Sequence, residues 1–536
     1  MARGSTGKTS MRWIARIVLA VAALLLAAFA WLGIPATGAG LVAKNVCSGV
    51  FVAGRSADDV LAADVLPASA MLAWVDVRVD GDRQRVTGRM LWSRERSAQL
   101  LPGLGCVLDP SPDLLQAAAQ LPAGPAVAAA PVADAGPVAE VGPATDAAPP
   151  SAGQPTFEPT GGSAIDRAAL LSVVDGSFDA PGDEDGSGTR AVVVLHRGRL
   201  VAERYASGFD ARTPQLGWSM SKTVLGMLVY AKLHEQGKAV TTRVLDWVEP
   251  SRRPAWLERW AGDGRAAMTV EDLLLMRDGL DHQEGYAPWS AVPRMLWGAE
   301  DVPAYAGSAA AEAAPGTRFR YLSATSNILS ALLRAQFEDD RSYWRYPYAA
   351  LFEPIGARSA VMEADARGNF IASSYLWATP HDWARIGEVM RLDGMTGDGV
   401  AGGRRVLPAG WLQFAGHPSP IDDPLASGYG AHVWLAGSPR GSTCGPDHGL
   451  PADTLMMTGH WGQVVAAIPS RDAVIVRLGM TLDRTRFSRC AFIHSILAAL
   501  PATRIQGRAA PSPLHARVKG TRGGPAFPGS PGANGQ

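Results

Sequence analysis

A serine and a lysine three residues apart carry the clearest chemical signal in this sequence. An apolar run, 224–230, follows Ser219 and Lys222 and predicts a buried helix that begins near Ser219. Residues at i and i+3 share one helical face, so the two side chains can touch. A serine hydroxyl needs an adjacent base to act as a nucleophile, and burial can turn a lysine into that base by lowering its pKa. A helix-capping serine beside a surface lysine is the alternative interpretation.

Two later segments could complete a site for acyl transfer. Within residues 315–323 a Pro-Gly turn leads to Tyr321 and Ser323, which we expect on one side of an extended segment. Tyr321 is a candidate proton carrier to the leaving group. In residues 458–463, glycines allow the backbone to approach a ligand closely, so this segment is the candidate oxyanion strand.

Taken in order, these segments resemble the motifs of the β-lactamase-related serine hydrolases. That family includes class C β-lactamases, family VIII esterases and 6-aminohexanoate-dimer hydrolases. Residues 219–222 resemble its Ser-x-x-Lys motif, and 268–280 resemble its LLTHTSGL helix and turn. Residues 315–323 resemble its PGxxFxYS segment, and 459–463 stand where its Lys-Thr-Gly strand is expected.

The resemblance covers residues 164–505 and implies both a fold and a role for each matched residue. The implied fold is α+β, of the β-lactamase/penicillin-binding-protein (transpeptidase) type, with an antiparallel sheet, flanking helices and a helical subdomain. Ser219 would attack a carbonyl and become acylated, and Lys222 would take its proton. Tyr321 would relay a proton to the leaving group and activate water for deacylation. The implied oxyanion donors are the backbone N–H groups of Ser219 and Gln463, and the other candidate substrate-binding residues are His460, Gly462 and Ser323.

Two departures from the family pattern bear on the substrate. Ser323 stands where class C β-lactamases have the Asn of Tyr-x-Asn, and His460 replaces the Lys of Lys-Thr-Gly. A histidine is mostly neutral at pH 7, so recognition of a β-lactam carboxylate is disfavoured and small esters or amides are expected. A DD-peptidase or β-lactamase is one alternative, and a non-catalytic binding protein that kept the fold is another. Residues 281–286 resemble the dimer-hydrolase branch most, and we assign them no catalytic role.

The pattern of elements agrees with an α+β fold. Two predicted strand pairs, 191–195 with 200–205 and 464–468 with 473–479, stand at the two ends of a mostly helical region. This order predicts one antiparallel sheet closed by its first and last segments. No metal or other cofactor is expected, because His282 and Glu284 lack a ligand spacing. The formal net charge is +0, which excludes the basic footprint of nucleic-acid binding.

Composition divides the chain into regions. Residues 41–112 contain a predicted β-hairpin, 74–79 with 85–92, and read as a small separate module with a spacer or docking role. The predicted regions are a cytoplasmic basic terminus (1–16), a membrane anchor (17–34), the module (41–112), an Ala/Pro-rich linker (113–162), the catalytic domain (163–505) and a disordered tail (506–536).

Residues 17–34 contain no charged side chain and follow a basic segment. About 18 apolar residues just span a bilayer, and the positive flank stays in the cytoplasm. We therefore expect a single-pass protein of the inner membrane with its catalytic domain in the periplasm. Secretion after cleavage of a signal peptide, with Thr37 and Ala39 at the cleavage site, is the alternative.

The 4 cysteines are widely spaced and form no CxxC pair, so zinc spacings are absent. An even count suits two disulfides in an oxidising compartment. Cys47–Cys106 and Cys444–Cys490 are the expected pairs, because each pair falls within one region. Four buried free thiols are the alternative.

Overall fold

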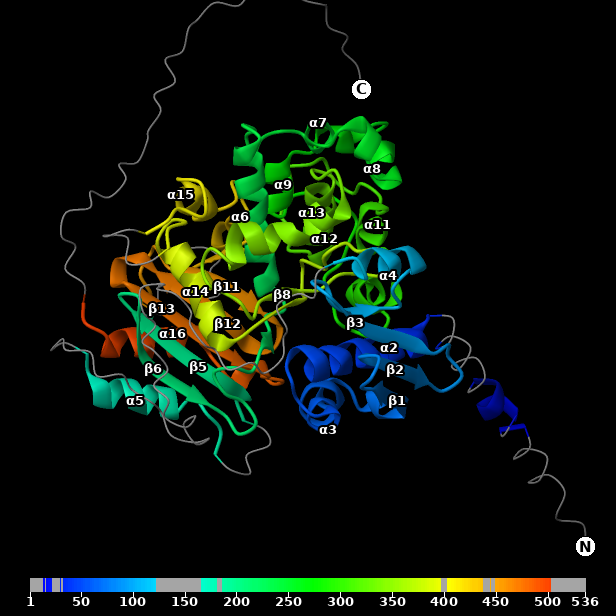
Figure 1. Cartoon of the computed structure of the whole chain (residues 1–536), viewed down its shortest axis with the longest axis horizontal. Helices are drawn as coiled ribbons and strands as arrows, with labels where there is room; N and C mark the ends of the chain where they lie inside the picture. Colours follow the sequence, from blue (N-terminus) through cyan, green and yellow to red (C-terminus); the bar gives the residue numbers. More distant parts are fainter. Residues whose placement is uncertain are drawn as a thin grey trace, which may run out of the picture. The chain divides into compact units, whose positions relative to one another are not determined.

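The computed structural model describes residues 13–14, 16–21, 29, 32–121, 165–180, 186–396, 403–436, 444 and 449–502 (Figure 1). Within these residues no helix is both long and apolar enough to cross a bilayer. Part of the predicted anchor 17–34 lies outside the described residues, as do most of the predicted linker and the whole predicted tail.

A six-stranded antiparallel sheet forms the centre of the catalytic region, with the strand order β10-β11-β12-β13-β5-β6 (Figure 1). Its pairing joins β13 to β5, with Ile475 opposite Val194, so the first and last strand pairs close one sheet as predicted. The strands are β5 (Thr189–His196), β6 (Arg199–Tyr205), β10 (Trp434–Leu435), β11 (Leu455–Gly459), β12 (Gln463–Ile468) and β13 (Ala473–Gly479).

Helices cover both faces of this sheet because its inner strands are apolar on both sides. Side chains alternate between faces along a strand. Val193 belongs to the core shared with α14 (Pro380–Arg391), whereas Val194 packs on the opposite face with α5 (Arg167–Asp175) and α16 (Arg489–Ala499). The inner strands β12, β13 and most of β5 are therefore buried on both faces.

A helical region and a small sheet separate the two strand pairs in the chain. The small antiparallel sheet has the order β7-β9-β8, formed by β7 (Gln215–Leu216), β8 (Val361–Met362) and β9 (Leu376–Ala378). The helices are α6 (Met220–Glu235), α7 (Val244–Trp247), α8 (Ala255–Trp260), α9 (Val270–Leu274), α10 (Ala291–Pro293), α11 (Val302–Gly307), α12 (Ser323–Arg334), α13 (Asp340–Pro347) and α15 (Trp411–Ala415). The predicted α+β class is confirmed.

The N-terminal region, 34–121, contains a four-stranded antiparallel sheet of order β1-β2-β3-β4, and its first two strands form the predicted hairpin. Its elements are α2 (Ile34–Cys47), α3 (Ala57–Val60), β1 (Val75–Asp80), β2 (Arg85–Met90), β3 (Arg96–Leu101), β4 (Gly105–Leu108) and α4 (Pro112–Ala118). This region is wider than the predicted 41–112 module. Helix α4 falls in the predicted linker, where Ser111 caps it by accepting a hydrogen bond from the Leu114 N–H (3.2 Å).

This N-terminal region shares a core with the catalytic region. Lys44 Nζ donates to Glu363 Oε2 at 2.8 Å, and both side chains are 0% exposed. Ser48 Oγ and the Cys106 N–H donate to the other carboxylate oxygen at 2.8 and 3.0 Å. A buried carboxylate with three donors is fully satisfied, so these contacts tie α2 and β4 to the catalytic region. Local sequence patterns cannot reveal this packing, because its partners lie hundreds of residues apart.

Both predicted disulfides form. Cys47–Cys106 joins α2 to β4, and Cys444–Cys490 joins a segment after β10 to α16. Each bond closes a loop within one region and so restrains the unfolded chain.

Candidate active site

Ser219 lies on the turn that precedes α6. It occupies the N-cap position, but its side chain makes no capping hydrogen bond, and the residue is half-buried. The preceding residue, Trp218, has a left-handed backbone (φ 50°), which few side chains adopt. Ser221 Oγ holds the turn by donating to the Trp218 carbonyl (2.7 Å) and accepting from the Leu376 N–H (3.1 Å). The Ser219 hydroxyl is therefore not used to cap α6.

Lys222 contacts the Ser219 hydroxyl directly. Its Nζ donates to Ser219 Oγ at 2.9 Å, to Ser323 Oγ at 3.1 Å and to the Ser373 carbonyl at 2.9 Å. Burial lowers the pKa of Lys222 from 10.5 to about 8, against the opposing effect of the Glu284 carboxylate. A lysine in this state is neutral often enough near neutral pH to accept a proton.

The Ser373 carbonyl that holds Lys222 is itself fixed by α12. Asn327 Nδ2 donates to Ser373 Oγ (3.0 Å), and Asn327 Oδ1 accepts from the Ser373 N–H (3.2 Å). These two residues support the position of the lysine, and sequence reasoning did not single them out.

Tyr321 also contacts Ser219. Its hydroxyl is hydrogen-bonded to the Ser219 side chain, and the centroid of its ring lies 5.1 Å from Lys222 Nζ. Burial and the charge of Glu284 raise the pKa of Tyr321 well above its ordinary value, so the phenol keeps its proton. Trp434 packs against the ring at 5.2 Å between centroids. Ser219 and Lys222, predicted from one motif, and Tyr321, predicted from another, are thus brought together.

Ser323 lies at the start of α12, not in the extended segment that the sequence suggested. Its Oγ donates to Glu284 Oε1 and its backbone N–H donates to Glu284 Oε2, both at 2.7 Å. Glu284 therefore places a negative charge next to Ser323, which accepts a hydrogen bond from Lys222. Sequence reasoning assigned Glu284 no catalytic role, although 281–286 already stood out by resemblance.

Tyr286, from the same loop, packs on His460. The two rings are stacked with centroids 4.4 Å apart and an interplanar angle of 13°, and Tyr286 is also hydrogen-bonded to Ser323. Burial, together with the smaller effect of the Arg484 charge, lowers the pKa of His460 to about 4. His460 is therefore neutral at pH 7 and supplies an aromatic wall rather than a cation.

The segment predicted as one oxyanion strand is a hairpin. Strand β11 ends at Gly459, residues His460–Gly462 make the turn, and Gln463 begins β12. The left-handed backbones of Trp461 (φ 58°) and Gly462 (φ 84°) close this turn. The positive φ of Gly462 and its packing against Arg477 give it a structural place in the turn.

The end of β11 lies on the Ser219 turn. A β-carbon at Gly459 would stand 2.2 Å from the Gly217 carbonyl oxygen, so only glycine fits there. Gln463 begins the next strand of the sheet, and its amide is bonded to the backbone of Gly479, accepting from the N–H at 2.9 Å and donating to the carbonyl. Both ends of the Gln463 side-chain amide are therefore bonded to β13.

These contacts join a serine hydroxyl, a buried lysine amine and a tyrosine hydroxyl in one hydrogen-bonded group. Such a group can perform acyl transfer through a covalent intermediate. In the described part of the chain, no three His, Cys, Asp or Glu side chains gather where they could hold a metal ion.

Comparison with known proteins shows the family to which the chain belongs. The model of the Beta-lactamase family matches residues 174–491, more than half of the sequence, and the chain belongs to this family. It is a serine hydrolase with the fold of the β-lactamase family.

Several individual proteins are similar to it. A 6-aminohexanoate-dimer hydrolase from Paenarthrobacter ureafaciens is 28% identical over 318 residues, covering 55% of this chain and 73% of that protein. A penicillin-binding protein homolog from Caulobacter crescentus is 17% identical, covers 65% of this chain and 100% of that one, and has a TM-score of 0.44. A family VIII carboxylesterase is 14% identical, with coverages of 65% and 99% and a TM-score of 0.47.

Proposed function

We propose that this serine hydrolase cleaves small esters or amides through an acyl-enzyme on Ser219. The observation that carries the proposal is the 2.9 Å contact of Ser219 Oγ with a buried lysine whose pKa falls to about 8. That contact gives the hydroxyl a base at hydrogen-bond distance, which nucleophilic attack requires.

In acylation, Lys222 takes the Ser219 proton while Oγ attacks the carbonyl carbon of the substrate. The bond to the leaving oxygen or nitrogen then breaks, and that atom takes a proton from the Tyr321 hydroxyl. Tyr321 suits this role because its raised pKa keeps the phenol protonated until the leaving group needs the proton. Tyr321 recovers its proton from Lys222. In deacylation, water adds to the ester carbonyl, and the same groups move protons in reverse.

The oxyanion needs donors beside Ser219. The Ser219 N–H at the start of α6 is one, favoured by the helix dipole. For the second donor we assign the N–H of His460 rather than that of Gln463. His460 directly follows Gly459, whose backbone lies against Gly217. Gln463 begins the neighbouring strand, β12, which is one strand further into the sheet than β11.

The substrate proposal follows from the charge at this strand end. Because His460 is neutral, it does not offer the cation with which a lysine at this position would bind the carboxylate of a β-lactam. The rings of His460, Tyr286 and Trp218 instead form an aromatic wall, with Trp218 at 6.3 Å from Tyr286 and 5.5 Å from His460. Such a wall favours an uncharged acyl or leaving group.

The test is the intact mass of the purified full chain after incubation with a fluorophosphonate. We expect one adduct on the wild type, none on Ser219→Ala, and an unchanged adduct on Ser427→Ala, a control at a half-buried serine whose hydroxyl donates to the Pro424 carbonyl. Ester and amide hydrolysis by the same three proteins follows. A folded wild type without an adduct would reject the acyl-enzyme and favour a binding protein. Faster turnover of nitrocefin than of any ester would favour the β-lactamase alternative.

We also propose that the catalytic region works outside the cytoplasm, carried there by the segment 17–34. The two disulfides support an oxidising compartment. The test fuses alkaline phosphatase, which is active only in the periplasm, to the C-terminus of the full chain in a bacterial host. Phosphatase activity in the membrane fraction is expected. Activity in the medium instead would mean cleavage and secretion, and an inactive fusion would reject export.

A further inference from the structure

Three exposed hydrophobic side chains lie together at one end of the β1–β2 hairpin in the N-terminal region. Val75 pairs with Met90 at the end of the ladder, so the next residues outward, Trp74 and Leu91, are neighbours, and Trp92 follows. Trp74, Leu91 and Trp92, here called the tryptophan patch, are 57%, 44% and 58% exposed. Contiguous apolar side chains on a surface mark a site of contact with a partner.

The tryptophan patch borders the first turns of α2. Met90 Sδ lies 3.3 Å from the position that a β-carbon on Gly38 would take, so the end of the hairpin packs against the second turn of this helix. Helix α2 begins at Ile34, which is the last residue of the charge-free segment 17–34. Phe29, within that segment, already packs against the core. The segment therefore runs directly into α2, beside the patch.

We propose that the tryptophan patch lies in the headgroup region of the bilayer that the segment 17–34 enters. This inference rests on the membrane role proposed above for that segment. A folded region that directly follows a membrane segment must lie against the bilayer, and tryptophan prefers the boundary between headgroups and acyl chains. Ile17, Val18 and Leu19 are themselves 59 to 69% exposed, as expected of side chains that lipid covers.

The exposed charges near the patch are of both signs. Arg89, Arg94 and Glu95 lie close to it in the chain and are exposed, and Arg94 lies 3.7 Å from the Asp109 carboxylate. The arginines can bind lipid phosphates. A strongly acidic partner would instead call for a clear excess of positive charge. The tryptophans rather than the net charge should hold the patch, so the contact should form on zwitterionic lipid.

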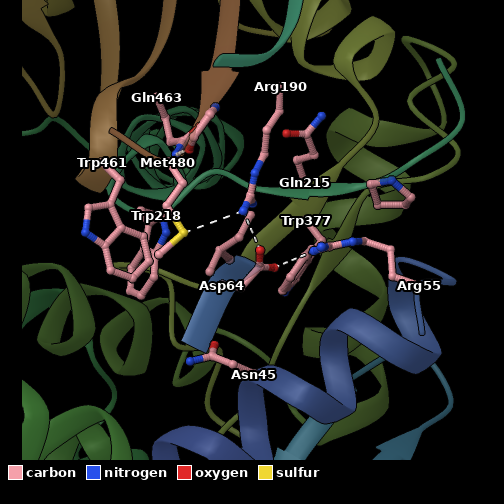
Figure 2. A pocket seen from close by; sticks show the side chains of 13 residues that line it. Asn45, Arg55, Asp64, Arg190, Gln215, Trp218, Trp377, Trp461, Gln463 and Met480 are labelled. Carbon is pink, nitrogen blue, oxygen red and sulfur yellow. Dashed lines mark hydrogen bonds and ion pairs between the residues drawn. The ribbon is translucent and has the colours of Figure 1, made fainter. Parts of the chain in front are cut away.

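The other end of α2 connects the patch to the region of the active site. Asn45 Oδ1 accepts from the Tyr375 hydroxyl at 3.3 Å, and Asn45 lines the same pocket as Trp218 (Figure 2). Trp218 directly precedes Ser219. Because α2 has 14 residues, it is about 21 Å long. A patch held on lipid at one end of this helix would therefore fix the distance of Ser219 from the bilayer.

The first experiment places the full chain in phosphatidylcholine vesicles and measures the depth of a fluorophore. All 4 cysteines are in disulfides, so a cysteine introduced by Leu91→Cys takes the label alone. Glu258→Cys, at an exposed position of α8, is the control. Nitroxide-labelled lipids should quench the label at 91 at least about twofold more strongly than the label at 258, because interfacial side chains reach the acyl boundary.

Flotation of the vesicles in a density gradient separates this inference from the membrane role of the segment 17–34. A chain that does not float would reject both. A chain that floats, with the label at 91 quenched no more than the label at 258, would overturn the lipid contact alone and leave the patch to a protein partner.

The second experiment removes the tryptophans from the chain labelled at 91. Trp74→Ser combined with Trp92→Ser should reduce the quenching toward that of the label at 258. Trp289→Ser, at a tryptophan of the catalytic region that is 60% exposed, is the matched control and should leave the quenching unchanged. Circular dichroism identifies a variant that fails to fold, and the first experiment then decides. A folded double variant with unchanged quenching would refute the role of the tryptophans.

Discussion

The Glu284 carboxylate accepts two hydrogen bonds from Ser323, one from its hydroxyl and one from its backbone N–H, each at 2.7 Å. Ser323 in turn accepts from Lys222 at 3.1 Å. A loop residue thus sets the electrostatic environment of the lysine through the first residue of a helix. The negative charge of Glu284 raises the pKa of Lys222, while burial lowers it more strongly. The balance of these two effects sets the pH above which the Lys222 amine is neutral.

Ester hydrolysis should rise with pH through an apparent pKa of about 8. Lys222 must be neutral to accept the Ser219 proton, and the neutral fraction grows as pH rises through its pKa of about 8. The measurement is kcat/KM for a neutral ester between pH 6 and 10. A rate that is constant across this range would exclude Lys222 as the base.

Glu284→Gln should move that rising limb to lower pH. Without the carboxylate, burial acts on Lys222 with less opposition, and its pKa falls further. The same pH profile checks this, with Glu338→Gln at an exposed position as the control. A variant that loses rate equally at every pH, with no displaced limb, would show that Glu284 acts only by placing Ser323.

Lys222→Met should lower kcat about 10²- to 10⁴-fold, the range typical of a general base, while leaving substrate binding nearly intact. The buried methionine fills similar space and carries no charge, so the fold should persist. Steady-state kinetics and circular dichroism check this together. Retention of more than a tenth of the wild-type kcat would contradict the assignment.

Gly459→Ala should lower activity about 10²-fold, because the new β-carbon would stand 2.2 Å from the Gly217 carbonyl and displace the end of β11 from Ser219. Gly264→Ala, where nothing lies within 4 Å of an added β-carbon, is the control. Kinetics on an ester measure both. Full activity of Gly459→Ala would mean that the end of β11 takes no part in catalysis.

Lys44→Met should destabilise the protein by about 3–5 kcal/mol, because it strands the buried carboxylate of Glu363. The double variant Lys44→Met, Glu363→Gln should recover much of that loss, since no buried charge is left unpaired. Chemical denaturation followed by fluorescence gives both free energies of unfolding. A single variant as stable as the wild type would show that the N-terminal region contributes little to the common core.

Local patterns predicted the strands and helices well, because alternation and apolar runs are properties of neighbouring residues. The hairpins of β1 with β2 and of β5 with β6 formed where alternation and turn residues placed them. The grouping of Ser219, Lys222 and Tyr321 was also predictable, since each lies in a recognisable motif.

What escaped the sequence depends on distant contacts. Glu284 lies on a loop whose course no periodicity reports, and it meets Ser323 only in the folded chain. The segment around His460 looked like a strand because its glycines suit close approach, yet the same glycines suit a turn. Lys44 offered no signal at all, because its partner Glu363 is 319 positions away.

The buried Lys44–Glu363 pair also has a consequence for a nicked chain. A protease that cut once between residues 122 and 164 would separate the chain into two pieces, and neither disulfide would link them, because each bond lies within one piece. The pieces would nevertheless stay associated through their common core. Such a sample would migrate as two bands on a denaturing gel and as a single particle in native mass spectrometry.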